Sequence, residues 1–356
     1  MERKEVVRYL LIGMITMTLV SILIVLRGGP TGYAVFSGIE ESGEYTLPLI
    51  VNISSDFSEE YYSFADLDND LILYMRMDDI NSSGHPTDLS GYSNNGTLVN
   101  NPIINSTNGY WGNGVSFDGS NYIEVPDSSS LDSPGITNEI TVCSWFKVDN
   151  QGTTYTGIVG KYDTIKAGGH RMFLMSRNAG DNKYGLFLSS AGTSFDASVL
   201  TNSALNTDQW YHLCGTSNGT LKLYLDGVQQ SATATLAGGI YSDADTSTLI
   251  GKFNRANSEF EGLIDEVLIF NRALTYDEIK AIYNSSANSY YQEFPNLNFG
   301  SHNLTGYDVN RSGDLNTTGL VSFDIVNDTG GDSEEKLSIV FDDLTSSGTY
   351  NGTSVY

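Results

Sequence analysis

The apolar residues of this chain fall into short runs, which are separated by turns rich in Gly, Asn, Asp and Ser. Short apolar runs at this spacing are typical of the strands of an all-β sandwich. One segment, LTYDEIKAIYN, predicts a helix instead, because Thr275 and Glu278 stand at capping-box spacing. Between Leu71 and about Asn284 the strand candidates include LILYMRM, NYIEV, ITVCSWFKV, YGLFLSS, QWYHLCGTS, LKLYLDG and STLIGKF.

The N-terminal region has a different pattern, since the segment from Tyr9 to Leu26 carries no charged residue. As a helix it would be about 27 Å long, close to the ~30 Å hydrocarbon core of a bilayer. Basic residues dominate on its N-terminal side, so we expect the bulk of the chain to lie outside the cell. The alternative is a secretory signal peptide cleaved near Gly32-Tyr33-Ala34, which would leave the protein secreted.

These patterns divide the chain into four parts. Residues 1–27 are expected to form a cytoplasmic tip and a transmembrane helix, which crosses the lipid bilayer with residues 9–26 and anchors a single-pass protein in the cell membrane. Residues 28–70 form a spacer, and residues 71–288 form the sandwich. Residues 289–356 form a small β-rich, glycosylated segment, which is a second small domain or an incomplete one.

Composition narrows the possible partners. The net charge of −25 and the pI of about 4.2 exclude nucleic acid, because phosphate binding needs clusters of Lys and Arg. An acidic surface instead attracts cations or simply keeps the protein soluble. Asn-X-Ser/Thr sequons agree with export, since they are acceptors for N-glycosylation. The acceptor residues are Asn52, Asn81, Asn95, Asn105, Asn218, Asn284, Asn303, Asn310, Asn316, Asn327 and Asn351.

A pair of acidic residues interrupts the apolar strand candidate EFEGLIDEVLIFNRAL. Because successive residues of a strand face opposite ways, one carboxylate must share a face with Leu263, Val267 and Ile269. We expect Asp265 to be the residue that needs explaining, and Glu266 to be solvated on the opposite face. A carboxylate on an apolar strand requires a cation, a ring of hydrogen-bond donors or an Arg partner.

Five motifs, taken in order, resemble laminin G-like jelly-roll domains of the concanavalin A-like lectin and glucanase fold. They are DLSGYSNNGTL, GVSFDGSNYIEV, ITVCSWFKV, QWYHLCGTSNGTLKLYLDGV and FEGLIDEVLIFNRALTYDEI. The resemblance covers about residues 71–284 and implies a jelly roll of two antiparallel sheets packed face to face. Cys143 and Cys214 stand where the pentraxins, a branch of this fold, have a disulfide. The alternative is two buried free thiols.

The resemblance also implies a structural Ca²⁺ ion. In many of these domains, the Asp residues of the DxSGxxxN loop, the FDG turn and the LID strand gather around one ion. The matching residues are Asp88, Asp118 and Asp265, with Asn94 as a possible carbonyl donor. Such hard oxygen ligands suit Ca²⁺. The alternative is that Asp265 accepts hydrogen bonds from backbone or Trp N–H groups, and that Asp118 belongs to an ordinary turn.

No catalytic arrangement stands out. The glucanase branch carries a Glu-x-Asp-x-Glu strand motif, whereas Glu261 and Asp265 lie four positions apart, about 13 Å along a strand. That separation is too large for a retaining pair of carboxyl groups. Glu259 and Glu261 have the right spacing, but no third acid is placed properly. We therefore expect a protein that is not an enzyme.

Aromatic residues in predicted loops are candidates for stacking on sugars. The weak candidates are Tyr110, Trp111 and Tyr162, with packing in the core as the alternative for Trp111. The sequence as a whole predicts a membrane-anchored cell-surface binding or adhesion protein, which presents a calcium-stabilised jelly roll to glycan or protein ligands. Two alternatives are a structural envelope glycoprotein with no ligand site and an accessory carbohydrate-binding module of a larger enzyme.

Overall fold

The computed structural model describes residues 34–37, 43–45, 49–55, 61–152, 154–283, 290–294 and 296–326. The predicted cytoplasmic tip and the anchor over residues 9–26 lie outside these ranges. Within them, none of the helices has both the length and the apolar composition needed to cross a membrane.

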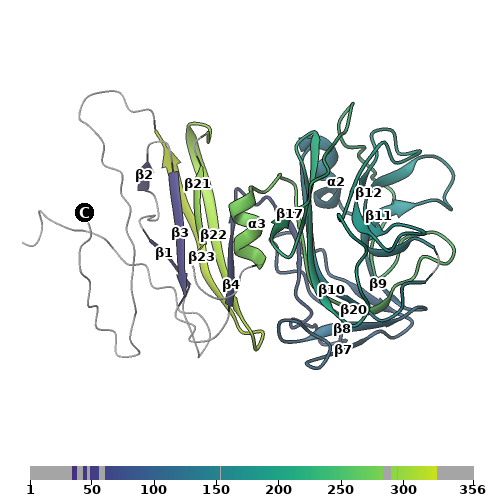
Figure 1. Ribbon diagram of the computed structural model, residues 1–356. Coiled ribbons are helices and arrows are strands. Elements are labelled where there is room, and N and C mark those ends of the chain that lie inside the picture. The colour runs from purple at the N-terminus through teal and green to yellow at the C-terminus, as the bar shows by residue number, and fades with distance from the viewer. Residues whose placement is uncertain are drawn as a thin grey trace, which may run out of the picture.

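Two large sheets pack face to face and form the predicted all-β sandwich (Figure 1). Every strand pairing within these two sheets is antiparallel. The nine-stranded sheet contains β5 (Leu71–Met75), β7 (Ile103–Asn105), β8 (Gly114–Asp118), β10 (Ile140–Val148), β15 (Trp210–Ser217), β16 (Thr220–Leu225), β17 (Val228–Gln229), β18 (Ala234–Thr235) and β20 (Glu261–Phe270). The seven-stranded sheet contains β6 (Thr97–Val99), β9 (Tyr122–Val125), β11 (Thr156–Asp163), β12 (His170–Arg177), β13 (Tyr184–Leu188), β14 (Ala197–Leu200) and β19 (Thr248–Ile250).

The main hydrophobic core lies between these two sheets. It takes Val142 and Phe146 from β10, Leu213 from β15, and Ile123 and Ile250 from the facing sheet, all of them buried. These side chains alternate with residues that face the other way, as the period of a strand requires. The described residues of the predicted jelly roll therefore form an all-β sandwich of antiparallel sheets, as predicted.

Two helices accompany the strands. Helix α2 (Ser129–Thr137) begins at Ser128, whose side chain accepts a hydrogen bond from the N–H of Leu131. Helix α3 (Tyr276–Tyr283) is the predicted one, and its capping box is present, since Thr275 and Glu278 each bond the other's backbone N–H. Figure 1 shows α3 between the jelly roll and a second group of strands.

That second group, here called the small β unit, is formed by strands from both ends of the described chain. Its three-stranded sheet has the order β1-β3-β21, and its four-stranded sheet has the order β2-β23-β22-β4. Residues 28–70 are therefore not a spacer, because their strands pair with those of the C-terminal segment, and the jelly roll is inserted between β4 and β21. The strands are β1 (Ala34–Ser37), β2 (Gly43–Tyr45), β3 (Leu49–Ser55), β4 (Tyr61–Leu67), β21 (Tyr290–Phe294), β22 (Gly300–Asn310) and β23 (Leu315–Ile325).

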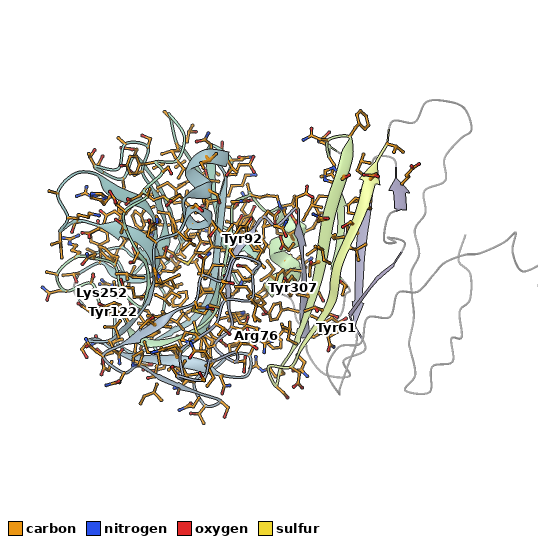
Figure 2. The ribbon with its side chains drawn as sticks, turned by 180° about the vertical axis from the view of Figure 1, so that it is seen from behind. Tyr61, Arg76, Tyr92, Tyr122, Lys252 and Tyr307 are labelled. Atoms are coloured by element: carbon orange, nitrogen blue, oxygen red, sulfur yellow. A yellow bond between two sulfur atoms is a disulfide. The ribbon has the colours of Figure 1, made fainter. Side chains whose placement is uncertain are left out.

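The small β unit covers the outer face of the nine-stranded sheet through a second hydrophobic cluster. Phe64 of β4 stacks on Tyr307 of β22 with ring centroids 4.8 Å apart, and it meets the edges of Tyr74 and Phe270 of the jelly roll. Figure 2 shows Tyr307 on the side of the small β unit that faces the jelly roll. The two units thus share one apolar interior.

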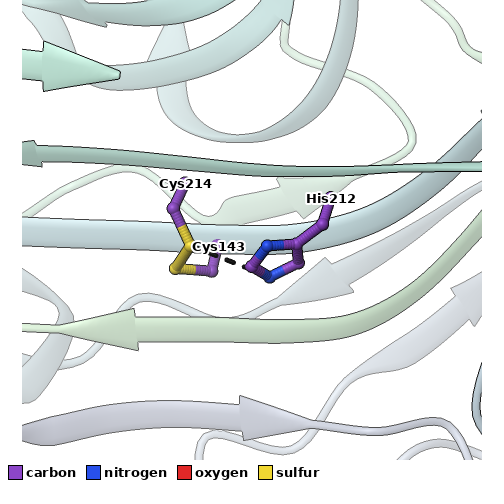
Figure 3. A group of neighbouring side chains, drawn as sticks. All are labelled: Cys143, His212 and Cys214. Carbon is purple, nitrogen blue, oxygen red and sulfur yellow. Dashed lines mark hydrogen bonds between the residues drawn. A yellow bond between two sulfur atoms is a disulfide. The ribbon is translucent and has the colours of Figure 1, made fainter. Parts of the chain in front are cut away.

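The disulfide predicted between Cys143 and Cys214 is present (Figure 3). The two cysteines are directly opposite each other on the neighbouring strands β10 and β15, and both are buried. His212 Nε2 lies 3.8 Å from the sulfur of Cys214. Burial lowers the pKa of His212 to about 3, so this imidazole is neutral.

The sequons differ in their surroundings. Asn310 and Asn316 are only 3% and 2% exposed, and the side chain of Asn310 is bonded to the neighbouring Asp314. A glycan needs an exposed amide, so the folded structure leaves no room for a sugar at these two positions. Asn81, Asn95, Asn105 and Asn218 are exposed and Asn303 is half-buried, whereas Asn52 lies in β3. Asn284, Asn327 and Asn351 are outside the described residues.

Candidate functional site

Strand β20 contains a bulge at the two adjacent carboxylates. Opposite it, Cys143 pairs with Leu268 and Trp145 pairs with Asp265, so β20 has one residue more than β10 over this stretch. Glu266 occupies the bulge with a φ of 50°. The bulge interrupts the alternation of side chains along the strand, so Asp265 and Glu266 lie on the same face. Both carboxylates point away from the sandwich core, towards the small β unit. The prediction of a solvated Glu266 is wrong, because this residue is only 2% exposed.

Asp265 is fully buried and is satisfied by a ring of donors. Its Oδ2 accepts hydrogen bonds from the backbone N–H groups of Tyr110 and Trp111, at 2.8 and 2.9 Å. Its Oδ1 accepts the N–H of Glu266 at 2.9 Å. Burial, and then the charge of Glu266, raises the pKa of Asp265 well above its usual range.

The other predicted calcium ligands lie apart from Asp265. Asp88 accepts hydrogen bonds from the N–H groups of Tyr74, Ser90 and Asn94, so its carboxylate organises its own loop. The side chain of Asn94 donates to the carbonyl of Ile72 and to Ser130.

Asp118 is exposed and bonds Ser120 in its own turn. It pairs across the sheet with Glu261, which is four positions from Asp265, about 13 Å along the strand. Among the described residues no three carboxylates come close enough to share an ion, and the sole cluster with ligand spacing is Cys143, His212 and Cys214, whose sulfurs are bonded to each other. The predicted set does not fit one Ca²⁺ ion.

Glu266 belongs instead to a buried polar network. Tyr62 of the small β unit donates its hydroxyl hydrogen to Glu266, and the Tyr62 and Tyr74 hydroxyl oxygens are 2.7 Å apart. Burial raises the pKa of Glu266 to about 8, although the neighbouring Arg76 opposes the shift. Arg76 also donates to the carbonyl of Gly313 in the turn after β22, at 2.5 Å. This network links the jelly roll to the small β unit.

The predicted ligand-binding aromatics pack inside the protein. Trp111 is fully buried, and Tyr110 stacks on Trp145 at 3.5 Å beneath the guanidinium of Arg311. Tyr162 is 7% exposed and stacks on Phe195 at 4.6 Å. All three rings are packed against other side chains, Tyr110 as a half-buried residue, and none of them lines the polar cavity of the jelly roll.

A polar cavity of about 200 Å³ lies on the outer face of the seven-stranded sheet. Ile123 and Val125 of β9 point into the core, so the alternate residues Tyr122 and Glu124 point outward and form part of the cavity floor. Figure 2 shows Tyr122 and Lys252 together on the side of the jelly roll that faces away from the small β unit. The lining residues are Tyr122, Glu124, Asp163, Asp245, Thr246, Ser247, Leu249, Lys252 and Asn254.

Contacts within the lining hold the cavity in shape. The ammonium of Lys252 lies 5.0 Å from the centre of the Tyr122 ring and forms an ion pair with Glu259 at 2.9 Å. Glu124 accepts a hydrogen bond from Ser247 at 2.8 Å. The sequence did not predict this site because its residues come from three separate segments, around Tyr122, at Asp163 and over residues 245–254, none of which carries a motif of its own.

Comparison with known proteins agrees with the architecture. Residues 117–280 match the family model described as the concanavalin A-like lectin/glucanases superfamily. The matched stretch lies within the jelly roll, from β8 to helix α3. Among curated relatives, C-reactive protein 1.1 of Limulus polyphemus is 25% identical over 179 residues, with 44% of this chain and 70% of the relative covered. C-reactive protein 1.4 of the same organism is 24% identical over 177 residues, with the same coverage.

Solved structures that resemble this chain have low sequence identity to it. Domain 4 of AbnA, a GH43 extracellular arabinanase from Geobacillus stearothermophilus solved with arabinotriose, is 22% identical with a TM-score of 0.47, over 64% of this chain and 100% of that domain. The binding domain of botulinum neurotoxin serotype D is 16% identical with a TM-score of 0.46, over 61% of this chain and 52% of that domain.

Proposed function

We propose that this protein is a glycan-binding module and that the sugar binds in the cavity over β9 and β19. The observation that carries the proposal is the composition of the lining, in which one tyrosine ring lies among carboxylate, amide and hydroxyl groups. A sugar presents both an apolar ring face and many hydroxyl groups, and such a mixed surface matches both. The match to a superfamily named for lectins supports the same class of ligand.

We propose that the module lies outside the cell and is anchored in the membrane by residues 9–26. Its disulfide supports an oxidising compartment, because disulfides are rare in the cytosol. The net charge of −25 suits a solvated exterior surface. Fractionation of cells with a reporter fused to the C-terminus tests this placement, which requires the reporter to remain with the membranes and to be accessible from outside.

We propose that the module binds without catalysis. In the cavity, Asp163 accepts hydrogen bonds from two backbone N–H groups and from Asn254, while the side chain of Asp245 is 71% exposed. Glu124, the third carboxyl group of the lining, is half-buried and accepts a hydrogen bond from Ser247. None of the three is therefore held as a buried proton donor against a free nucleophile. Mass spectrometry of the bound glycan after prolonged incubation should recover it intact, and shortened products would contradict the proposal.

A glycan array probed with the full-length chain tests binding, and Tyr122→Ala tests the site. Loss of the ring should weaken binding about 10-fold, since an aromatic contact contributes on the order of 1 kcal/mol beyond its area. The matched control is Tyr276→Ala in α3, which removes an exposed ring with Lys280 at 5.9 Å on the opposite side of the jelly roll from the cavity. No binding to any glycan would overturn the function, and equal weakening by both variants would overturn the site.

A further inference from the structure

The hydrogen-bond donors of the cavity are largely used within its own lining. The hydroxyl of Ser247 donates to Glu124, and the amide nitrogen of Asn254 donates to Asp163 at 2.5 Å. The charge of Lys252 is compensated by Glu259, which is not among the lining residues. A ligand that relies on accepting hydrogen bonds or on negative charge therefore meets few free partners.

Acceptors, in contrast, remain available. Glu124 uses only one of its two oxygens for Ser247. The carboxylate of Asp245 is 71% exposed beside the cavity, and it has a long ion pair with Lys166 at 3.9 Å through one of its oxygens. The amide oxygen of Asn254 adds a neutral acceptor, since only its nitrogen is used by Asp163. Thr246, which is 6% exposed, lines the cavity with a hydroxyl that has no hydrogen-bond partner among the described residues.

The charge of the lining favours the same kind of ligand as its surplus of hydrogen-bond acceptors. The lining holds three carboxylates, those of Glu124, Asp163 and Asp245, and one ammonium, which is paired with Glu259. The ammonium of Lys166, outside the lining, lies 3.9 Å from Asp245 and offsets part of this negative charge. A carboxylate or sulfate on the ligand would be repelled, whereas a protonated amine would be attracted and would donate up to three hydrogen bonds.

We propose that the glycan bound in this cavity is an amino sugar with a free, protonated amine. The inference rests on the proposed function, because it assigns the ligand class of the same site. The amine donates to Glu124 and to the neighbouring acceptors, while a face of the sugar ring lies against Tyr122. Acidic sugars are excluded by the carboxylates, and N-acetylation removes the charge that the cavity selects.

Calorimetry with the full-length chain tests this with three oligosaccharides of equal length. They are a β-1,4-linked glucosamine pentamer, its fully N-acetylated counterpart and a galacturonic acid pentamer, compared at a pH where the amine is protonated. The glucosamine pentamer should bind about 10-fold more tightly than the N-acetylated one, since hydrogen bonds to charged groups are the stronger class. Added salt should reduce this difference.

Variants separate the cavity from the general negative charge of the protein. Glu124→Gln keeps the shape of the side chain and should weaken binding of the glucosamine pentamer about 3- to 10-fold, with little change for the N-acetylated pentamer. The matched control is Glu44→Gln, at an exposed residue of β2 in the small β unit, which should change nothing. Equal weakening by both variants would overturn the inference, because overall charge would then explain the binding.

The remaining outcomes distinguish the two proposals. Tight, Tyr122-dependent binding of the acidic or the N-acetylated pentamer would overturn the amino-sugar inference and leave the glycan-binding function standing. Absence of binding to all three pentamers, together with a blank glycan array, would overturn both. Displacement of the glucosamine pentamer by a lysine pentapeptide at equal concentration would show recognition of any cation and overturn the assignment to a sugar.

Discussion

Asp265 obtains its hydrogen-bond donors from a loop that is far away in the sequence. The requirement for a cation, a ring of donors or an Arg partner follows from the apolar residues around it in the strand. The surrounding residues do not indicate which of the three Asp265 uses, because its donors, the N–H groups of Tyr110 and Trp111, lie 155 and 154 residues away in the sequence. The pairing of Cys143 with Cys214 could be predicted from a family resemblance. The hydrogen bonds to Asp265 could not, because they depend on where the Tyr110–Trp111 loop lies in the folded protein.

We expect Asp265→Ala to destabilise the protein by about 2–3 kcal/mol, because two backbone N–H groups of the Tyr110–Trp111 loop would lose their buried acceptor. The loss in urea unfolding experiments should be the same with Ca²⁺ and with a chelator. Asp118→Ala is the control and should change the free energy of unfolding by less than about 0.5 kcal/mol, because Asp118 is exposed. A loss confined to the Ca²⁺ condition would contradict this and restore the metal site.

At the scale of the element, the bulge in β20 decides which face its acidic residues occupy. Strand period alone assigns Asp265 and Glu266 to opposite faces, and that assignment fails because the bulge inserts one residue into the ladder. The existence of the strand, the helix over LTYDEIKAIYN and the sandwich all follow from local patterns. A bulge, by contrast, is set by the pairing of β20 with β10, and no residue type in the segment signals it.

The bulge gives the stability of the protein a particular dependence on pH. Burial raises the pKa of Glu266 from 4.5 to about 8, so the folded state holds a proton that the unfolded state has already lost. Stability should therefore fall as the pH rises from about 4.5 to about 8 and then level off, with a slope of up to about 1.4 kcal/mol per pH unit from this group.

Glu266→Gln should flatten this slope, because the amide has no proton to lose at these pH values. Urea unfolding at pH 5.5, 6.5 and 7.5 measures it, with Glu261→Gln in the same strand as the control. Equal slopes for the wild type and for Glu266→Gln would show that another group is responsible.

At the scale of the whole molecule, the small β unit and the jelly roll share one hydrophobic cluster. All three tryptophans, Trp111, Trp145 and Trp210, belong to the jelly roll, so their fluorescence follows the unfolding of that unit, and Trp111 also contacts Tyr62 of the small β unit. Phe64→Ala in β4 should lower the midpoint of the tryptophan transition by an amount equivalent to about 3–5 kcal/mol, since it removes a buried ring from the shared cluster.

The control for this prediction is Leu320→Ala in β23, where the side chain is 56% exposed and little should change. A tryptophan transition that does not move in Phe64→Ala would mean that the two units unfold independently. Two separate calorimetric transitions in the wild type would contradict shared unfolding in the same way.

The insertion of the jelly roll into the small β unit also determines how the protein responds to mechanical force. The chain enters and leaves the jelly roll side by side, where the N–H of Asn271 donates to the carbonyl of Asp70 and Arg272 forms an ion pair with Asp70. Tension applied through Ala34 and Val326 therefore acts across the paired strands of the small β unit, while the jelly roll hangs from two adjacent points and carries almost none of it. Under a pulling force the small β unit would unfold first, and the cavity over β9 and β19 would keep its shape until the strands of the small β unit had separated from one another.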